Sequence, residues 1–415
     1  MENASNTRYV MFLIARFMVI MSTSPVDIMA VYRLSSSRNS VVLFGITMLV
    51  ELCIVLVFQP FLSSRLDRIE RKTVQKVNNT LMIVVLGSML IIYTYVGLRN
   101  NIIYSVYLVI NGVFFSVVWQ TFNAMVQTVG DREQYGKLAG LMEMMGQSPV
   151  VLGALVSAAM FAYFGFTASL ILSLALLCIA LAFLYSFEER FVPDGKLKKT
   201  KAGAGIRENA DYIRKNSRLV MYIFLLNFPF IAIVTGNFLK PIYISQVLHG
   251  GPSELAISEG VYALAAILAG LVMPRINRHI GYFLSIYACT IVFIIGSVIM
   301  PFFPFFAAYF LFQTFHGFGN PGIRVSRNTL VMKNIPREEM GRFNGAIQLL
   351  TTPVRIILLT VFMITVGYLG PGMLIFISGM LVMVASTLSL DLYRSSPQLK
   401  AIFATEQMIS NAGVV

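Results

Sequence analysis

The chain has 415 residues, of which 57% are hydrophobic and only 12% are charged, and its mean hydropathy is +0.75. Soluble domains contain about 45–50% apolar and about 25% charged residues, so the composition excludes an ordinary soluble protein. The three cysteines, Cys53, Cys178 and Cys289, all lie in apolar runs and predict neither a disulfide framework nor a zinc site.

Apolar runs that are long enough to cross a bilayer recur along the whole chain. The first run has no small-residue cleavage site, so we interpret it as a retained helix rather than a signal peptide. We therefore expect an all-α membrane protein with two six-helix halves and spans at 9–33, 39–62, 79–97, 102–128, 138–162, 166–186, 219–243, 254–274, 282–303, 305–332, 344–366 and 371–392.

The distribution of basic residues predicts the orientation of these spans. With both termini in the cytoplasm, 24 of the 32 Lys and Arg residues fall in cytoplasmic segments. Only four lie near the outer face, namely Arg33, Arg38, Arg99 and Lys240. This asymmetry explains the formal net charge of +13 without a nucleic-acid partner, and it predicts a multi-pass protein of the inner membrane.

The longest polar stretch, 188–218, divides the chain into a bundle at 1–187 and a bundle at 219–393, which is followed by a cytoplasmic tail at 394–415. Within the stretch, Ile206, Ala210 and Ile213 recur at helical spacing. This pattern indicates an amphipathic helix on the inner membrane surface, and a flexible basic linker that contacts anionic lipid remains the alternative.

An internal repeat is the most specific signal in the sequence. Residues 132–140 read REQYGKLAG and residues 337–345 read REEMGRFNG, an offset of 205 that also pairs Asn111 with His316 and Gly112 with Gly317. A repeat of half the chain length predicts two related halves around a pseudo-twofold axis, with a cavity between them.

Three segments carry a resemblance to the major facilitator superfamily over nearly the whole chain. The loop SSRLDRIERK resembles the family's motif after its second helix, and the linker and the tenth and eleventh helices resemble the subgroup of the enterobactin exporter and macrolide efflux proteins. The resemblance implies a fold of twelve helices and assigns a cytoplasmic gate to Asp67, Arg68 and Arg71.

The segment GQSPVVLG at 146–153 is similar to the family's antiporter signature, which implies export. Ser148 and Leu152 replace two of its glycines, and Leu108 replaces the arginine of another family motif. The direction of transport therefore stays open at this point.

Ionisable side chains inside the spans cost at least about 2.5–3.5 kcal/mol each on insertion scales, so they mark sites that face a cavity or a partner. Arg16 and Asp27 are eleven residues apart, which places them on one helical face within about 20°. Pro25 invites a bend beside Asp27. Desolvation favours the neutral form of a carboxyl group and so raises its pKa toward physiological pH, as a proton-coupled carrier requires. We therefore predict that Asp27, Glu51 and Glu143 are candidates for proton coupling. The alternative is that Asp27 caps the cavity at the outer headgroups, beside Arg33.

The remaining candidates are polar or basic residues that could bind a substrate. Arg324, Arg327 and Arg355 would suit an anionic group if they line a cavity, or a gate if they pair with acidic residues. Amide, indole and imidazole groups in the spans can contact a ligand or join helices. The predicted substrate-binding set is Arg16, Trp119, Asn123, Asn227, Asn237, His316, Arg324 and Arg355. Glu259 is a weaker candidate because it lies near the outer surface.

No nucleotide-binding loop, metalloprotease motif or catalytic triad is found in the sequence, so we do not expect an enzyme and expect no cofactor. The energy for transport would come from an ion gradient, with H⁺ as the expected ion. The leading hypothesis is a monomeric carrier in the bilayer that exports a small amphiphilic molecule such as a siderophore, an antibiotic or a drug-like compound. Uptake of a nutrient or metal chelate is the runner-up, and a membrane sensor or scaffold without transport is an alternative from another class.

Overall fold

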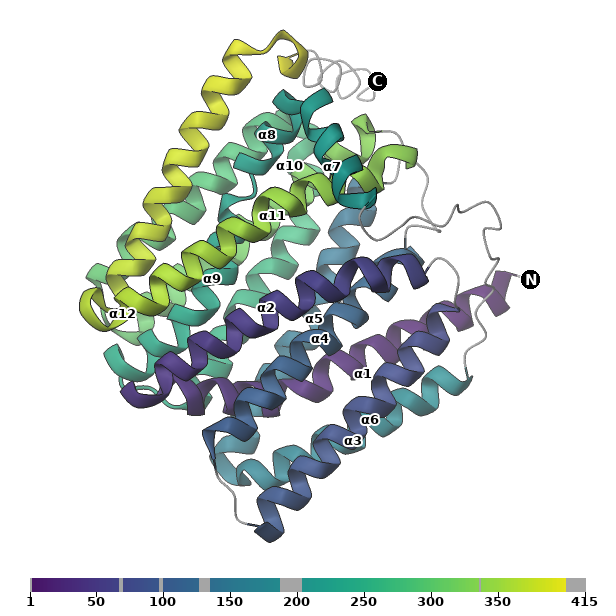
Figure 1. Ribbon diagram of the computed structural model, residues 1–415, viewed down its shortest axis with the longest axis vertical. Coiled ribbons are helices and arrows are strands. Elements are labelled where there is room, and N and C mark those ends of the chain that lie inside the picture. Colours follow the sequence, from purple (N-terminus) through teal and green to yellow (C-terminus); the bar gives the residue numbers. More distant parts are fainter. Residues whose placement is uncertain are drawn as a thin grey trace. The chain divides into compact units, whose positions relative to one another are not determined.

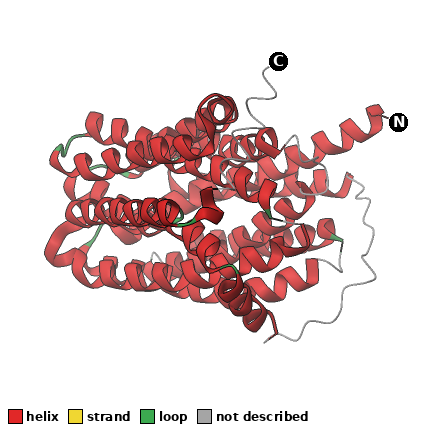
Figure 2. Ribbon diagram, turned by 90° about the horizontal axis from the view of Figure 1, so that it is seen from above, coloured by secondary structure: helices red, strands yellow, loops and turns green. Residues whose placement is uncertain are grey.

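The computed structural model describes residues 2–66, 70–96, 100–126, 135–186, 204–335 and 337–400. All regular elements of these residues are helical (Figure 2). The α-helices are α1 Glu2–Ser35, α2 Arg38–Leu66, α3 Arg71–Ile91, α4 Asn101–Val126, α5 Tyr135–Tyr163, α6 Gly165–Ser186, α7 Ala204–Lys215, α8 Ser217–Leu225, α9 Phe228–Ile242, α10 Pro252–Ile299, α11 Phe306–Asn334 and α12 Arg337–Ser395. Short π-helical turns lie at η1 Ile92–Val96 and η3 Tyr243–Val247, and a 3₁₀ turn lies at η4 Met300–Phe302.

Two long helices each contain two of the predicted spans. α10 is interrupted at Gly281 and α12 at Gly370, where φ is 79° and 74°. Gly165, the first residue of α6, has φ 77°. Because side chains disfavour this left-handed region, glycine is the residue that lets one helix follow another with a minimal connection.

Among the described residues, nine helices are long and apolar enough to cross a membrane. α10 and α12 each supply one further span, and α11 supplies the twelfth, so all twelve predicted spans coincide with helices. α11 is less apolar than the other spans because it carries many polar and basic side chains, several of which are buried inside the protein. Large apolar side chains such as Val57, Leu81 and Leu264 are exposed instead, as expected for a surface in contact with lipid.

The chain forms two compact units. The first comprises Met1–Val129, Ser148–Thr200 and Ile244–Gly260, and the second comprises Gly130–Gln147, Lys201–Tyr243 and Val261–Val415. Within the described part of the first unit, α1 packs against α6 and α4, and α2 packs against α4 (Figure 1). Within the second, α12 packs against α7, α8 and α9.

The described part of the polar linker contains the helix α7. α7 packs against α12, and its Tyr212 is buried beside Phe343 with the ring centroids 6.4 Å apart. Asn209 lies against Gly345, the last residue of the second copy of the repeat. The side of α7 that carries Asn209 and Tyr212 is therefore in contact with α12. Asp211, Arg214 and Lys215 are exposed.

Candidate functional site

Asp27 of α1 is held by α4. The Asn111 amide donates a hydrogen bond to the Asp27 carboxyl group, with Nδ2 and Oδ1 2.7 Å apart. One turn earlier on α4, the Tyr107 hydroxyl lies 3.5 Å from the carbonyl of Thr23. α1 remains helical through Pro25, so the proline does not break the helix beside Asp27. The side chain of Asp27 is partly exposed.

The amide of Asn111 also carries an acceptor, its Oδ1. Its Oδ1 is buried and has no hydrogen-bond donor among the described residues. An ionised carboxylate accepts only, whereas a protonated carboxyl group also carries an O–H donor. Asn111 can therefore serve both forms: its N–H₂ donates to either one, and its oxygen can accept from the protonated one.

Glu51 of α2 approaches the neighbouring residue of α4. A side chain at Gly112 would overlap the carboxyl group of Glu51, so this carboxyl group packs directly on the glycine. Two of the three predicted proton-coupling residues thus contact consecutive positions of one helix, Asn111 and Gly112. The sequence does not predict that the two residues contact neighbouring positions, because Asp27 and Glu51 belong to different helices.

Arg16 meets the same helix closer to the N-terminus of α1. Its guanidinium carbon lies 5.5 Å from the centre of the Trp119 ring, a cation–π distance, and Trp119 is itself 44% exposed. Arg16 and Asp27 therefore both contact α4, in agreement with the helical face predicted from their spacing. The α1–α4 contact therefore has the guanidinium group of Arg16 toward one end and the carboxyl group of Asp27 toward the other.

Several predicted site residues lie outside the part of the chain that can be described. Asp67 and Arg68 of the predicted gate belong to this group, and Arg71 is described as the first residue of α3. Asn123 and Glu143 lie in α4 and α5, but the description does not extend to their side chains. Asn237 is exposed on α9, and Glu259 is partly exposed on α10.

The second unit gives Asn227 a definite partner. The segment between α8 and α9 leaves the helical path at Leu226 and Asn227, just before Pro229. Arg327 of α11 is buried here, with its NH1 hydrogen-bonded to Asn227 Oδ1 and 3.5 Å from the carbonyl oxygen of Leu226. These contacts satisfy polar groups at the broken helix, which is a structural use of the arginine.

The three arginines that were predicted as a cluster, Arg324, Arg327 and Arg355, have different surroundings. Arg355 of α12 stacks over Phe230, with 5.8 Å from the guanidinium carbon to the ring centre. Arg324 is partly exposed, whereas Arg327 is buried at the helix break. Of the three, Arg324 and Arg355 therefore remain better candidates than Arg327 for contact with a substrate.

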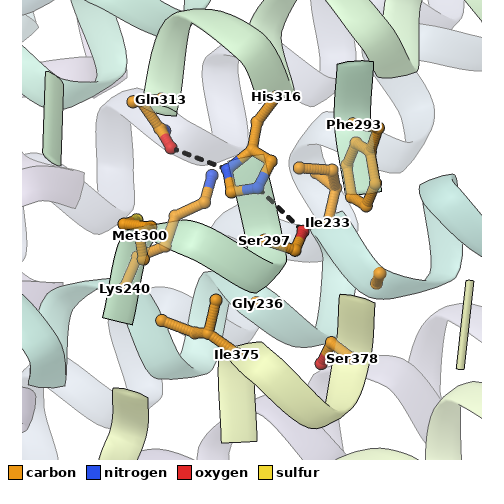
Figure 3. A pocket seen from close by; sticks show the side chains of 11 residues that line it. Ile233, Gly236, Lys240, Phe293, Ser297, Met300, Gln313, His316, Ile375 and Ser378 are labelled. Carbon is orange, nitrogen blue, oxygen red and sulfur yellow. Dashed lines mark hydrogen bonds between the residues drawn. The ribbon is translucent and has the colours of Figure 1, made fainter. Parts of the chain in front are cut away.

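His316 lines a small pocket inside the second unit (Figure 3). Ser297 Oγ lies 2.8 Å from its Nε2, and Gln313 Oε1 lies 3.4 Å from its Nδ1. Lys240 lines the same pocket and is only 6% exposed. Sequence reasoning missed Lys240 because it was counted as a residue near the outer face. Its signal was a lysine inside an apolar run, directly before Pro241.

Comparison with solved structures identifies proteins with the same fold. A bacterial homologue of the iron transporter ferroportin, in an outward-facing state, has a TM-score of 0.64 at 15% identity, covering 93% of this chain and 99% of its own. The nucleoside transporter NupG has a TM-score of 0.64 at 14% identity, covering 94% and 100%. A human organic anion transporter has a TM-score of 0.64 at 13% identity, covering 92% and 98%.

No curated protein matches the chain in a sequence search. The model of the family described as Major Facilitator Superfamily matches residues 9–358. This match spans most of the chain and agrees with the long apolar helices and with the solved structures of similar fold. The protein therefore belongs to the Major Facilitator Superfamily and is a multi-pass membrane transporter of small molecules, not an enzyme.

Proposed function

We propose that this transporter exports a small amphiphilic molecule across the inner membrane by alternating access, and that proton movement through Asp27 drives it. The observation that carries the proposal is the contact between Asp27 and Asn111, in which one amide can bond both the ionised and the protonated carboxyl group. A coupling site must pass repeatedly between these two forms. A buried structural carboxylate needs a partner for only one of them.

The Arg16–Trp119 pair supports an amphiphilic substrate. The exposed indole of Trp119 on α4 lies next to the buried guanidinium group of Arg16 on α1, so an apolar surface and a charge lie side by side. Export over import rests on Pro149 and Gly153, the two retained residues of the antiporter signature at 146–153, whereas Ser148 and Leu152 depart from the signature. Uptake of a nutrient or a metal chelate is the second candidate.

The test uses inside-out membrane vesicles with an imposed proton gradient and a panel of fluorescent amphiphiles. We expect gradient-dependent accumulation of at least one dye, abolished by a protonophore. Asp27→Asn should reduce uphill accumulation at least tenfold while leaving downhill exchange, because the amide keeps the shape and cannot titrate. The matched control is Asp391→Asn, which makes the same chemical change at an exposed position of α12 and should behave like the wild type.

Two results would contradict the proposal in different ways. Wild-type coupling in the Asp27→Asn variant would assign the proton to another group, with Glu51 next in line. Accumulation in intact cells instead of inside-out vesicles would reverse the direction and favour the uptake carrier.

A further inference from the structure

The pocket around His316 is lined only by residues of the second unit. It is formed by α9, the second half of α10, η4, α11 and the second half of α12. Its cavity volume is about 20 Å³, which exceeds the roughly 10–15 Å³ that one water molecule requires. The pocket therefore has room for one small species but not for an organic substrate.

The absence of a side chain at Gly236 helps to create this space. Gly236 lies in the middle of α9 and lines the pocket, and a Cβ built on it would meet no atom within 4 Å. Because glycine inside a helix is less stable than alanine, the open position is kept at some expense of stability. A methyl group at this position would enter the open space.

Polar side chains line the pocket from four helices, α9, α10, α11 and α12. Figure 3 shows the side chains of Lys240 and Gln313 directed at the imidazole of His316, with Ser297 on its other nitrogen. Gln313 has no exposed surface, and its Nε2 has no hydrogen-bond acceptor among the described residues. A buried amide donor that stays unpaired destabilises the folded protein, so a bound acceptor would be stabilising.

The groups at this pocket are predominantly donors. Lys240 contributes an ammonium group, held 4.9 Å from the centre of the Tyr262 ring, and Gln313 contributes amide N–H groups. None of the eleven described residues that line the pocket is acidic. A water molecule accepts two hydrogen bonds and must place its own two hydrogens, whereas a halide only accepts and also carries a charge opposite to that of the ammonium group.

We propose that this pocket binds a small monovalent anion of halide size, held by Lys240 and Gln313. The proposal is independent of the exported substrate and of the role of Asp27. A bound anion would stabilise the packing of α9 against α11, since Lys240 and Gln313 come from these two helices.

Purified wild-type protein is titrated with bromide against gluconate at constant ionic strength, and the thermal unfolding midpoint is measured. We expect a saturable rise in the midpoint with bromide and none with gluconate, which is too large for the pocket. Equilibrium binding of radioactive chloride should approach one ion per chain. An equal response to both anions, or no saturation, would mean that the pocket holds water and would overturn the proposal.

Paired variants locate the site. Gly236→Ala should weaken bromide binding at least tenfold, whereas Gly87→Ala should not, although both glycines lie inside helices with room for a Cβ. Lys240→Met should abolish the response, whereas Lys333→Met, which removes a lysine 5.1 Å from the Tyr282 ring, should retain it. If the Lys240 variant does not fold, the glycine pair still decides. Equal bromide binding by the two glycine variants would place the anion elsewhere and refute the assignment.

Discussion

At the scale of single residues, the glycines paired by the internal repeat have different neighbours. A Cβ at Gly112 would overlap the carboxyl group of Glu51, the far end of a flexible side chain. A Cβ at Gly317 would overlap the backbone carbonyl of Tyr262 and lie 2.9 Å from the Cβ of Ala265. Both positions require glycine for close helix approach, but only the second meets rigid backbone.

This difference predicts unequal costs for the same substitution. Gly317→Ala should lower the free energy of unfolding by about 1–3 kcal/mol, since two helices must move apart, and Gly112→Ala should cost less. Adding Glu51→Ala should relieve most of the Gly112→Ala defect and none of the Gly317→Ala defect. Thermal unfolding of the single and double variants in detergent tests this, and equal losses at the two glycines would contradict the assigned contacts.

At the scale of elements, α7 is attached to α12 through the second copy of the repeat. The Tyr212 hydroxyl interacts with Glu339, and its ring packs on Phe343. Burial raises the pKa of Tyr212, and the charge and hydrogen bond of Glu339 raise it further, although Arg342 opposes them. The docked helix therefore favours the neutral phenol.

The sign of this shift predicts a pH dependence for α7. A raised pKa in the docked state adds stability that is fully present below the ordinary tyrosine pKa of about 10 and is lost as pH rises through the docked value. Amide hydrogen exchange in 204–215, corrected for the intrinsic rate, should therefore accelerate above about pH 10. Tyr212→Phe should flatten this dependence because phenylalanine does not titrate. The same acceleration in the Phe variant would show that another group loosens the helix.

At the scale of the whole molecule, the distribution of basic residues predicts one orientation in the membrane. Lys215 ends α7 and is exposed, whereas Tyr368 lies between the eleventh and twelfth spans and is 89% exposed. If both termini are cytoplasmic, these two positions must lie on opposite sides.

Cysteine labelling in intact cells tests this orientation. A membrane-impermeant maleimide should modify Tyr368→Cys and leave Lys215→Cys unmodified until the cells are lysed. Each variant is the control of the other, because both positions are exposed in the folded protein. Labelling of Lys215→Cys before lysis would reverse the orientation and make the linker external.

The sequence also contained part of the candidate site. The spacing of Arg16 and Asp27 predicted a shared helical face, and both residues contact α4. Their partners Asn111 and Trp119 could not be matched to them, because helical periodicity gives the direction of a side chain but not the neighbouring helix. Arg327 was grouped with Arg324 for the same reason, although Arg327 donates a hydrogen bond to Asn227, between α8 and α9.

The sequence by itself determined that the chain is a helical membrane protein with twelve spans, because each span must contain enough apolar residues to cross the bilayer and satisfy its own backbone hydrogen bonds. It also determined the internal repeat. Only the tertiary structure decided that Asp27 bonds to Asn111, that Glu51 packs on Gly112, and that Lys240 shares a pocket with His316. These contacts join residues far apart in the chain, and helix packing, which follows from the shapes of all the side chains together, selects them.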